Sequence, residues 1–350
     1  MISKSTNLVM EGDQVEIKHY APVIIPTLCR HDHFKACLES LRKCTHANKT
    51  EVYIGLDYPL KESHWEGYNK IVAYLDSIKS DHGFKKLHII KREKNYGVGS
   101  NGNARSLRDY ILSRFDNYIF SEDDNIFAPA FLDYCNKGLE KYRNDESIIA
   151  ICGYRNYYNF KFANNTIARQ GMDFVAWGYA TWKDRIDSYV ILSPQWFRHQ
   201  FSIKRFVSFR RTNGNYRALG WLQHCFRPHR DFSVYDDTLS VMMGLVNKFT
   251  IMPSVSLVKN IGADGSGWHF QDKRTELDHI LKNQEIFSGE TYDFIGPDTN
   301  YYEENMKINK EECYNKISNT RFPIEIFKMF WSKLMTWYSS FKKNRKCVNV

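Results

Sequence analysis

The stretch Asn117-Tyr118-Ile119-Phe120-Ser121-Glu122-Asp123-Asp124 places three consecutive carboxylates directly after a short apolar run. Its aromatic and β-branched residues predict that residues 117–120 form a buried β-strand. Adjacent carboxylates at the end of such a strand repel one another and resist desolvation, and a bound divalent cation removes that cost. Their oxygens are the hard ligands that Mg²⁺ or Mn²⁺ prefers. A solvated acidic turn before the helix expected near Pro129 is the alternative, because carboxylates favour helix N-termini.

Strands and helices are expected to alternate from Ala21 to Gly153. Apolar and β-branched runs predict strands at residues 22–27, 51–56, 86–91, 117–120 and 148–152. Apolar residues at helical spacing predict helices at residues 32–44, 65–78, 103–115 and 130–142. Repeated β-α units of this kind indicate an α/β fold, in which a mostly parallel sheet carries helices on both faces.

Polar residues follow several of these strands. Arg30, Asp57, the segment Asn95–Asn103 and the acidic triplet all come just past a predicted strand end. In parallel sheets of this type, ligands bind outside the carboxyl ends of the strands. We therefore expect these residues to share one cleft.

The segment Asn95–Asn103 is a Gly/Asn-rich loop that opens a helix. Such loops expose backbone N–H groups and the helix N-terminus attracts phosphate, although most glycine loops are only turns. Asn103 and Arg105 lie on the first helical turn, where a side chain could reach a diphosphate or a base. Asp57 could accept hydrogen bonds from a nucleobase or a ribose hydroxyl, or it could cap the next turn.

Three further motifs lie in the second half of the chain. Tyr235-Asp236-Asp237-Thr238 precedes an apolar helix; one aspartate suffices as a cap, so the other could be a general base. The loop from Gly262 to His269 could close over a nucleotide, with Ser266 on phosphate and His269 near the metal, although a lone loop histidine is more often a surface residue. The stretch Trp177-Gly178-Tyr179-Ala180-Thr181-Trp182 is either core or an aromatic platform for a sugar ring.

The order of these motifs resembles that of the GT-A glycosyltransferases over roughly Ala21 to Gln271. It is most similar to the bacterial family 2 type enzymes of polysaccharide assembly and to the N-acetylglucosaminyltransferase I group. The most specific stretches are the acidic triplet with Asn125-Ile126-Phe127-Ala128-Pro129-Ala130-Phe131, and the loop from Asn260 to His269. The helix after the glycine loop aligns loosely, and the segment from Tyr154 to Arg230 does not match.

The resemblance implies how the donor is held. Arg30 would contact the diphosphate of a UDP-sugar, UDP-N-acetylglucosamine among the candidates, and Asp57 would contact the uracil. Asp124 would ligate Mn²⁺ or Mg²⁺, with His269 near the ion. Glu122 and Asp123 would hold hydroxyls of the ribose and of the sugar, and the other candidates for donor binding are Asn103, Arg105 and Ser266.

On the acceptor side, the resemblance implies inverting transfer by this metal-dependent enzyme. Asp236 follows an aromatic residue, as the catalytic base does in that group, and is preferred to Asp237. The candidate platform for the acceptor or sugar comprises Trp177, Gly178, Trp182 and Tyr235. The acceptor would be an oligosaccharide or a lipid-linked glycan of a bacterial capsule or lipopolysaccharide.

Three segments are expected along the chain. Residues 1–20 are an extension, residues 21–275 form the transferase domain, and residues 276–350 form a helical, basic and aromatic tail. Within the domain, residues 21–153 would bind the nucleotide sugar and residues 154–275 would hold the acceptor and the base. In the tail, residues 323–350 would either dock on the domain or lie on an anionic membrane surface.

The composition sets further limits. With 43% hydrophobic and 25% charged residues among 350, the chain is globular rather than disordered. It has no apolar run of about 18 residues and no secretory signal, and its eight cysteines form no C-x-x-C pair. We therefore expect a cytoplasmic protein, peripheral on the inner face of the membrane if the tail binds lipid.

Two other classes of function remain as alternatives. A sugar-phosphate nucleotidyltransferase would use the same acidic metal site, but its usual Arg/Lys-bearing glycine loop is missing after the first strand, where Thr27-Leu28-Cys29-Arg30 stands. A non-catalytic nucleic-acid-binding protein would suit the net charge of +9. The chain shows no zinc, helix-turn-helix or RNP-like signature, so nucleic acid is not an expected partner.

Overall fold

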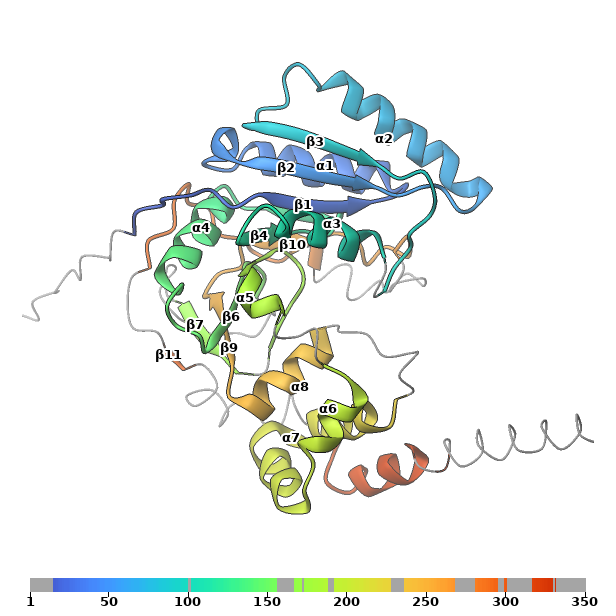
Figure 1. Ribbon diagram of the computed structural model, residues 1–350, viewed down its shortest axis with the longest axis vertical. Helices are drawn as coiled ribbons and strands as arrows, with labels where there is room; N and C mark the ends of the chain where they lie inside the picture. Colours follow the sequence, from blue (N-terminus) through green and yellow to red (C-terminus); the bar gives the residue numbers. More distant parts are fainter. Residues whose placement is uncertain are drawn as a thin grey trace, which may run out of the picture. The chain divides into compact units, whose positions relative to one another are not determined.

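The computed structural model describes residues 15–99, 102–155, 167–171, 173–187, 192–227, 236–267, 281–294, 299–300, 317–329 and 331. The chain divides into two compact units (Figure 1). The first unit comprises Met1–Val190 and Lys248–Tyr301, and the second comprises Ile191–Asn247 and Tyr302–Val350. The expected transferase domain, residues 21–275, is thus divided between these two units.

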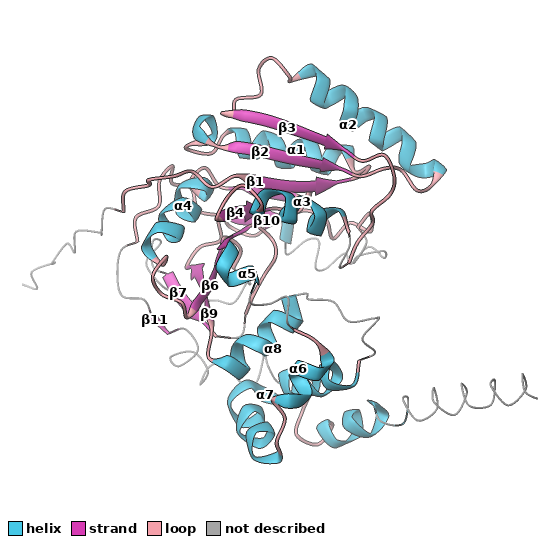
Figure 2. Cartoon of the chain, viewed as in Figure 1, coloured by secondary structure: helices cyan, strands magenta, loops and turns pink. Residues whose placement is uncertain are grey.

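The first unit is built on a nine-stranded sheet in the order β11-β7-β9-β6-β8-β4-β1-β2-β3 (Figure 2). Its strands are β1 Val23–Thr27, β2 Glu51–Leu56, β3 Lys86–Lys91, β4 Asn117–Phe120, β6 Ile148–Cys152, β7 Ile167–Gln170, β8 Tyr179–Trp182, β9 Phe249–Pro253 and β11 Thr299–Asn300. β1, β2, β3 and β4 run parallel, as do β6 and β9, while β8 runs antiparallel to both β4 and β6. The predicted α/β fold with a mostly parallel sheet is thus confirmed.

The helices of this unit follow the strands as the β-α pattern predicts. They are α1 His31–Arg42, α2 Trp65–Ser77, α3 Asn103–Leu112, α4 Phe131–Lys141 and α5 Lys183–Asp187, with short 3₁₀ turns at Ala47–Lys49 and Glu62–His64. A second, two-stranded sheet pairs β5 (Asn125–Phe127) antiparallel with β10 (Val258–Asn260). This small sheet brings residues far apart in sequence to the end of β4.

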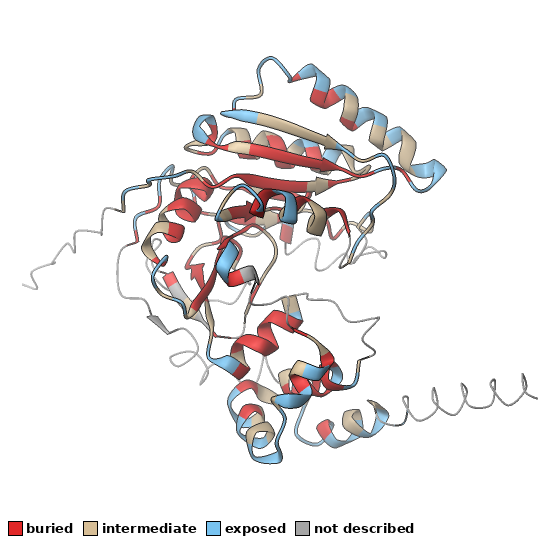
Figure 3. Ribbon diagram, in the orientation of Figure 1, coloured by how far each residue is buried: buried red, intermediate tan, exposed pale blue. Residues whose placement is uncertain are grey.

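Successive side chains of β2 pack against helices on opposite faces of the sheet. Val52 and Ile54 belong to the core shared with α1 and α2, whereas a Cβ on Gly55 would meet Asn103 and Leu107 of α3. Successive residues of a strand point to opposite faces, so β1 and β2 must be apolar on both. Both strands are buried almost throughout, and β3 at the edge is only half-buried (Figure 3).

The second unit is helical in its described parts. It contains α6 Pro194–His199, α7 Ile203–Phe226, α8 Asp236–Val246 and a helix over residues 322–329. Gly214 interrupts α7 with φ 80° and ψ 171°, a conformation that L side chains rarely adopt. The buried Trp221 ring forms the centre of the core and contacts Phe201, Phe206 and Phe209, and its Nε1 donates to the Phe197 carbonyl at 3.1 Å. In the described residues, no helix has the length and apolarity needed to cross a bilayer.

Candidate active site

Three strand ends meet beside the acidic triplet. Thr27 ends β1, and the triplet follows β4, the parallel neighbour of β1. Asn260 ends β10, where its backbone lies opposite Asn125 in the small sheet. The carboxyl ends of β1 and β4 and one end of the small sheet therefore contribute side chains to one place, as the sequence predicted for Arg30 and the triplet.

Arg30 links two of the three carboxylates. One guanidinium nitrogen contacts Asp123 Oδ1, and Nη1 lies 2.8 Å from Asp124 Oδ2. The two aspartate side chains are only 9% and 8% exposed, while the Arg30 side chain is 21% exposed. One cation therefore neutralises two buried like charges that would otherwise repel each other.

The outer oxygens of the same carboxylates accept from neutral donors. Thr27 Oγ1 donates to Asp123 Oδ2 at 2.8 Å, and Asn260 Nδ2 donates to Asp124 Oδ1 at 2.7 Å. All four carboxylate oxygens of the aspartate pair are thus hydrogen-bonded to the protein itself. Thr27 and Asn260 were not among the predicted site residues. The available signals were the position of Thr27 at a strand end and that of Asn260 at the start of the loop that carries the resemblance, and the β5–β10 pairing shows how Asn260 reaches Asp124.

The backbone of Gly262 passes close to the Asp124 carboxylate. A Cβ at this position would lie 2.0 Å from Asp124 Oδ2 and 3.2 Å from Arg30 Nη1, so a side chain and the observed carboxylate position exclude each other. The Gly262 amide donates to Asn260 Oδ1 at 2.9 Å, and the Ile261 amide donates to the Asp124 carbonyl at 2.9 Å. The glycine of this loop is therefore needed for close approach to Asp124.

Burial and the charges of neighbouring side chains act against each other in this cluster. Burial raises the pKa of the Asp124 carboxyl, and the Arg30 charge acts against that rise. Burial also works to lower the pKa of Arg30, but Asp123 and Asp124 together raise it above its ordinary value. Arg30 accordingly remains charged, and it is the principal compensation for the two buried carboxylates.

Asp57 follows β2 at the same edge of the sheet and organises the Gly/Asn-rich loop. Its carboxylate accepts from the backbone amides of Tyr58, Tyr96 and Gly97 at 2.8–2.9 Å. The residue is 4% exposed. The proposed contact between Asp57 and a uracil stays a prediction, while the structure shows that this carboxylate fixes the loop beside it.

The candidates on the first turn of α3 have local partners. Asn103 is buried; its Nδ2 donates to the Gly55 carbonyl at 2.6 Å and its Oδ1 accepts from Arg92 Nε at 3.0 Å. Arg105 Nε donates to both Asp109 oxygens, at 3.1 and 3.2 Å, in an i,i+4 pair. Asn103 therefore joins α3 to β2, and Arg105 lies on the helix surface.

The remaining member of the triplet, Glu122, is half-buried. Its carbonyl oxygen accepts from Ser121 Oγ at 2.7 Å and from the Cys37 thiol at 3.5 Å. Its proposed contact with ribose or sugar hydroxyls stays a prediction.

Asp264 organises the loop that follows Gly262. It accepts from the Ser266 amide at 3.0 Å and from Ser266 Oγ at 2.6 Å, and it lies 3.1 Å from His33 Nε2 on α1. Burial works to raise the pKa of Asp264, but the Ser266 hydrogen bonds and the charges of His33 and Arg30 hold it below its ordinary value. His269 and Tyr235, two predicted site residues, lie outside the described residues.

The two tryptophans of the predicted sugar platform differ in burial. Trp177 is half-buried, and its ring meets the Tyr154 ring edge-on with the ring centroids 4.7 Å apart. Trp182 is 1% exposed and packs in the core. Gly178 has φ 72° between them, and a Cβ there would meet Val258 at 2.8 Å. Trp182 thus has no exposed ring face for a sugar, and its part of the stretch follows the core alternative.

The aspartates proposed as catalytic bases begin α8, in the second unit. Asp236 is half-buried and Asp237 is exposed. The Asp237 carboxylate lies 3.7 Å from Nε2 of His224, a histidine on α7 whose side chain is only 2% exposed. The structure therefore places Asp237 beside a buried histidine of the neighbouring helix α7.

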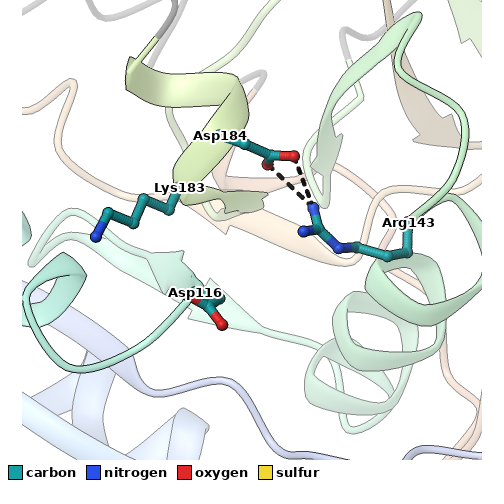
Figure 4. A pocket seen from close by; sticks show the side chains of 4 residues that line it. All are labelled: Asp116, Arg143, Lys183 and Asp184. Carbon is teal, nitrogen blue, oxygen red and sulfur yellow. Dashed lines mark hydrogen bonds and ion pairs between the residues drawn. The ribbon is translucent and has the colours of Figure 1, made fainter.

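A cavity of about 240 Å³ lies at the opposite end of β4 from the triplet. Its lining residues are Asp116, Arg143, Lys183 and Asp184 (Figure 4). Arg143 Nη1 and Asp184 Oδ2 face each other at 2.9 Å. The charges of Asp116 and Asp184 balance those of Arg143 and Lys183. Nucleotides bind at the carboxyl ends of parallel strands, so this cavity at the amino end of β4 is not a candidate donor site.

The aspartate pair could bind a divalent cation if further oxygen ligands completed the coordination. Asp123 and Asp124 are hard oxygen donors that already converge on one positive group, which fits Mg²⁺ or Mn²⁺. Within the described ranges, no three His, Cys, Asp or Glu side chains converge to hold an ion. A cation bound by this pair would therefore need further oxygen ligands, and it would displace Arg30 from Asp124.

Structural comparison aligns the chain with several solved proteins at low similarity. A mannosyltransferase of Pyrobaculum calidifontis in complex with GDP-Man and Mn²⁺ aligns with TM-score 0.35 and 12% identity, over 52% of this chain and 50% of its own length. Residues 1–349 of S. aureus TarS align with TM-score 0.36 and 10% identity, over 86% of this chain and 76% of TarS. HddC of Yersinia pseudotuberculosis aligns with TM-score 0.28 and 12% identity, over 48% of this chain and 80% of HddC.

The chain thus spans half the length of the mannosyltransferase. No family model matches the chain, and no curated protein matches its sequence.

Proposed function

We propose that the protein is a glycosyltransferase that moves a sugar from a nucleotide-sugar donor to a hydroxyl of a glycan or lipid-linked oligosaccharide. The observation that supports it is the cluster of Arg30, Asp123 and Asp124 at the carboxyl ends of β1 and β4. Nucleotides bind at this edge of open parallel sheets, and a guanidinium fork suits the oxygens of a diphosphate. UDP is the expected nucleotide, by the resemblance described above.

On the donor side, Arg30 would bind the diphosphate and stabilise the charge that develops as it leaves. Asp57 would keep the Gly/Asn-rich loop at the edge of the donor site through the three amides it already accepts from. Asp123 and Asp124 would hold the divalent cation, which supplies positive charge to the departing diphosphate. Glu122 would contact hydroxyls of the ribose or of the sugar.

On the acceptor side, Asp236 would take the proton of the attacking hydroxyl. Attack on the face of the anomeric carbon opposite the diphosphate inverts its configuration. Asp237 has a different neighbourhood, since its carboxylate lies beside the buried His224. We assign the base to Asp236, which follows an aromatic residue as the base does in the resembled group, and a role in helix contact to Asp237.

The first test is calorimetric titration of the protein with a panel of nucleotide sugars, in Mn²⁺ and then in EDTA. Binding of one UDP-sugar that requires Mn²⁺, lost in Asp124→Asn, is the expected result. Mass spectrometry of a glycan acceptor incubated with that donor then reports transfer. Donor affinity that is identical in Mn²⁺ and EDTA would remove the cation from the proposal.

The base is tested by Asp236→Asn. Loss of the proton acceptor should lower turnover by about 10²–10⁴-fold and leave donor affinity nearly unchanged. Asp237→Asn is the matched control on the same helical turn and should retain most of the turnover. An equal loss of donor affinity and turnover in Asp236→Asn would contradict the assignment.

We further propose that the tail brings the enzyme to an anionic membrane surface on the cytoplasmic side. Ile324, Phe327 and Trp331 are 52–64% exposed, while Phe322 is buried. Phe322 stacks on Phe206 of α7, and the Arg210 guanidinium lies over its ring at 4.4 Å. Asn319 and the Ile317 carbonyl also accept hydrogen bonds from Arg210 and Asn215 of α7. Beyond these contacts, Ile324, Phe327 and Trp331 stay exposed next to the exposed Lys328, which suits anionic lipid.

A further inference from the structure

Arg30 occupies the carboxylates that a divalent cation would need. Its guanidinium contacts one oxygen of Asp123 and one of Asp124, the latter at 2.8 Å. The two remaining oxygens accept from the neutral donors Thr27 and Asn260. The positive charge at this place therefore comes from a side chain of the protein itself.

We infer that Arg30 is an exchangeable counter-ion, which holds Asp123 and Asp124 until a divalent cation replaces it and then turns to the diphosphate of the donor. Its competition with the cation follows from the geometry alone, while its transfer to the diphosphate rests on the function proposed above. Arg30 is in this sense a positioning residue for the cation.

The surroundings of Arg30 allow this exchange. Arg30 is the N-cap of α1, with non-helical backbone angles (φ −86°, ψ 70°), so its side chain can turn away without unwinding the helix. At 21% exposure it is also the most accessible member of the cluster. Leaving the aspartates would bring it toward solvent and any bound diphosphate.

The aspartates, by contrast, are held in place without Arg30. Thr27 and Asn260 fix their outer oxygens, and the Gly262 backbone limits movement of Asp124. The pair therefore stays arranged for a positive group when Arg30 departs. A guanidinium and a divalent cation cannot both occupy this place, because like charges at close range repel strongly in a buried site. Each must weaken the binding of the other.

The test is the affinity for Mn²⁺ alone, measured by electron paramagnetic resonance and calorimetry without nucleotide. Arg30→Met should bind Mn²⁺ about tenfold more tightly than the wild type or better, because the competing charge is gone. Arg30→Lys should fall between the two, since an ammonium lacks the fork that spans both carboxylates. Arg42→Met is the matched control: Arg42 ends the same helix and pairs with Glu39 at 3.1 Å, so its loss should leave Mn²⁺ affinity unchanged.

Mn²⁺ affinity in Arg30→Met equal to or below that of the wild type, including no binding by either protein, would overturn the inference. Circular dichroism and thermal melting establish that the variant folds; if it does not, the affinity of the folded Arg30→Lys decides by the same criterion. Failure of this inference is distinguishable from failure of the proposed glycosyltransferase function. Sugar transfer that persists in EDTA would leave that proposal standing even if every variant failed to bind Mn²⁺.

Discussion

At the scale of the residue, the position of Asp124 depends on close contacts from three directions. Arg30 and Asn260 each bond one of its oxygens, and the Gly262 backbone passes where no Cβ could fit. Burial raises the pKa of this carboxyl, and the Arg30 charge and the Asn260 hydrogen bond act against that rise. Adding a single carbon atom at Gly262 is consequently enough to disturb the position of Asp124.

Gly262→Ala should displace Asp124 and disturb Arg30. Its Cβ would lie 2.0 Å from Asp124 Oδ2, so the carboxylate or the loop must move, at a cost of about 1–3 kcal/mol in the free energy of unfolding. Donor affinity, measured by calorimetry, should fall as well. Gly220→Ala is the control, because its Cβ would lie 3.6 Å from Val241 in ordinary contact. Full stability and donor affinity in Gly262→Ala would mean that Asp124 is not held as described.

At the scale of the element, the contact between α7 and α8 contains a titratable group. His224 of α7 packs against Phe197 of α6 with ring centroids 4.9 Å apart, and the Asp237 carboxylate of α8 lies 3.7 Å from its Nε2. Burial lowers the pKa of His224 from its ordinary value of 6.5, although Asp237 acts in the opposite direction. The folded second unit therefore favours the neutral imidazole.

This shift predicts acid sensitivity of the second unit. As the pH falls below 6.5, the unfolded state binds a proton that the folded state resists, so the free energy of unfolding should decrease with falling pH. One such proton contributes a slope of at most about 1.4 kcal/mol per pH unit. Urea unfolding followed by tryptophan fluorescence should show a shallower pH dependence in His224→Gln than in the wild type. Parallel curves for the two proteins would show that His224 is not the responsible group.

At the scale of the whole molecule, the exposed apolar residues of the tail bear on where the enzyme works. Replacing Phe327 and Trp331, whose rings stack 5.9 Å apart, by serine should reduce co-sedimentation with vesicles containing anionic lipid. Binding should also weaken with added salt, because the basic residues contribute electrostatically. Serine at the exposed Tyr110 of α3 is the control and should have no effect. Unchanged vesicle binding by the double variant would refute a membrane role for this helix.

Except for the short strand β5, the sequence by itself determined the order of strands and helices up to β6, because apolar residues at periods of two and 3.6 directly encode which faces are buried. It also placed Arg30 and the acidic triplet at strand ends, and in parallel neighbouring strands those ends must coincide. It did not reveal the role of Asn260, which reaches Asp124 only through the antiparallel pairing of two short strands far apart in the chain.

Only the tertiary structure decided which polar residues already make hydrogen bonds or ion pairs within the protein. Asp57 and Arg105 are both charged residues that the sequence offered for donor binding, yet one accepts from three backbone amides and the other pairs with Asp109 on a helix surface. The burial of Trp182 and the division into two units were likewise beyond local patterns. The physical reason is that burial and hydrogen bonding depend on segments distant in sequence, whose approach no local period records.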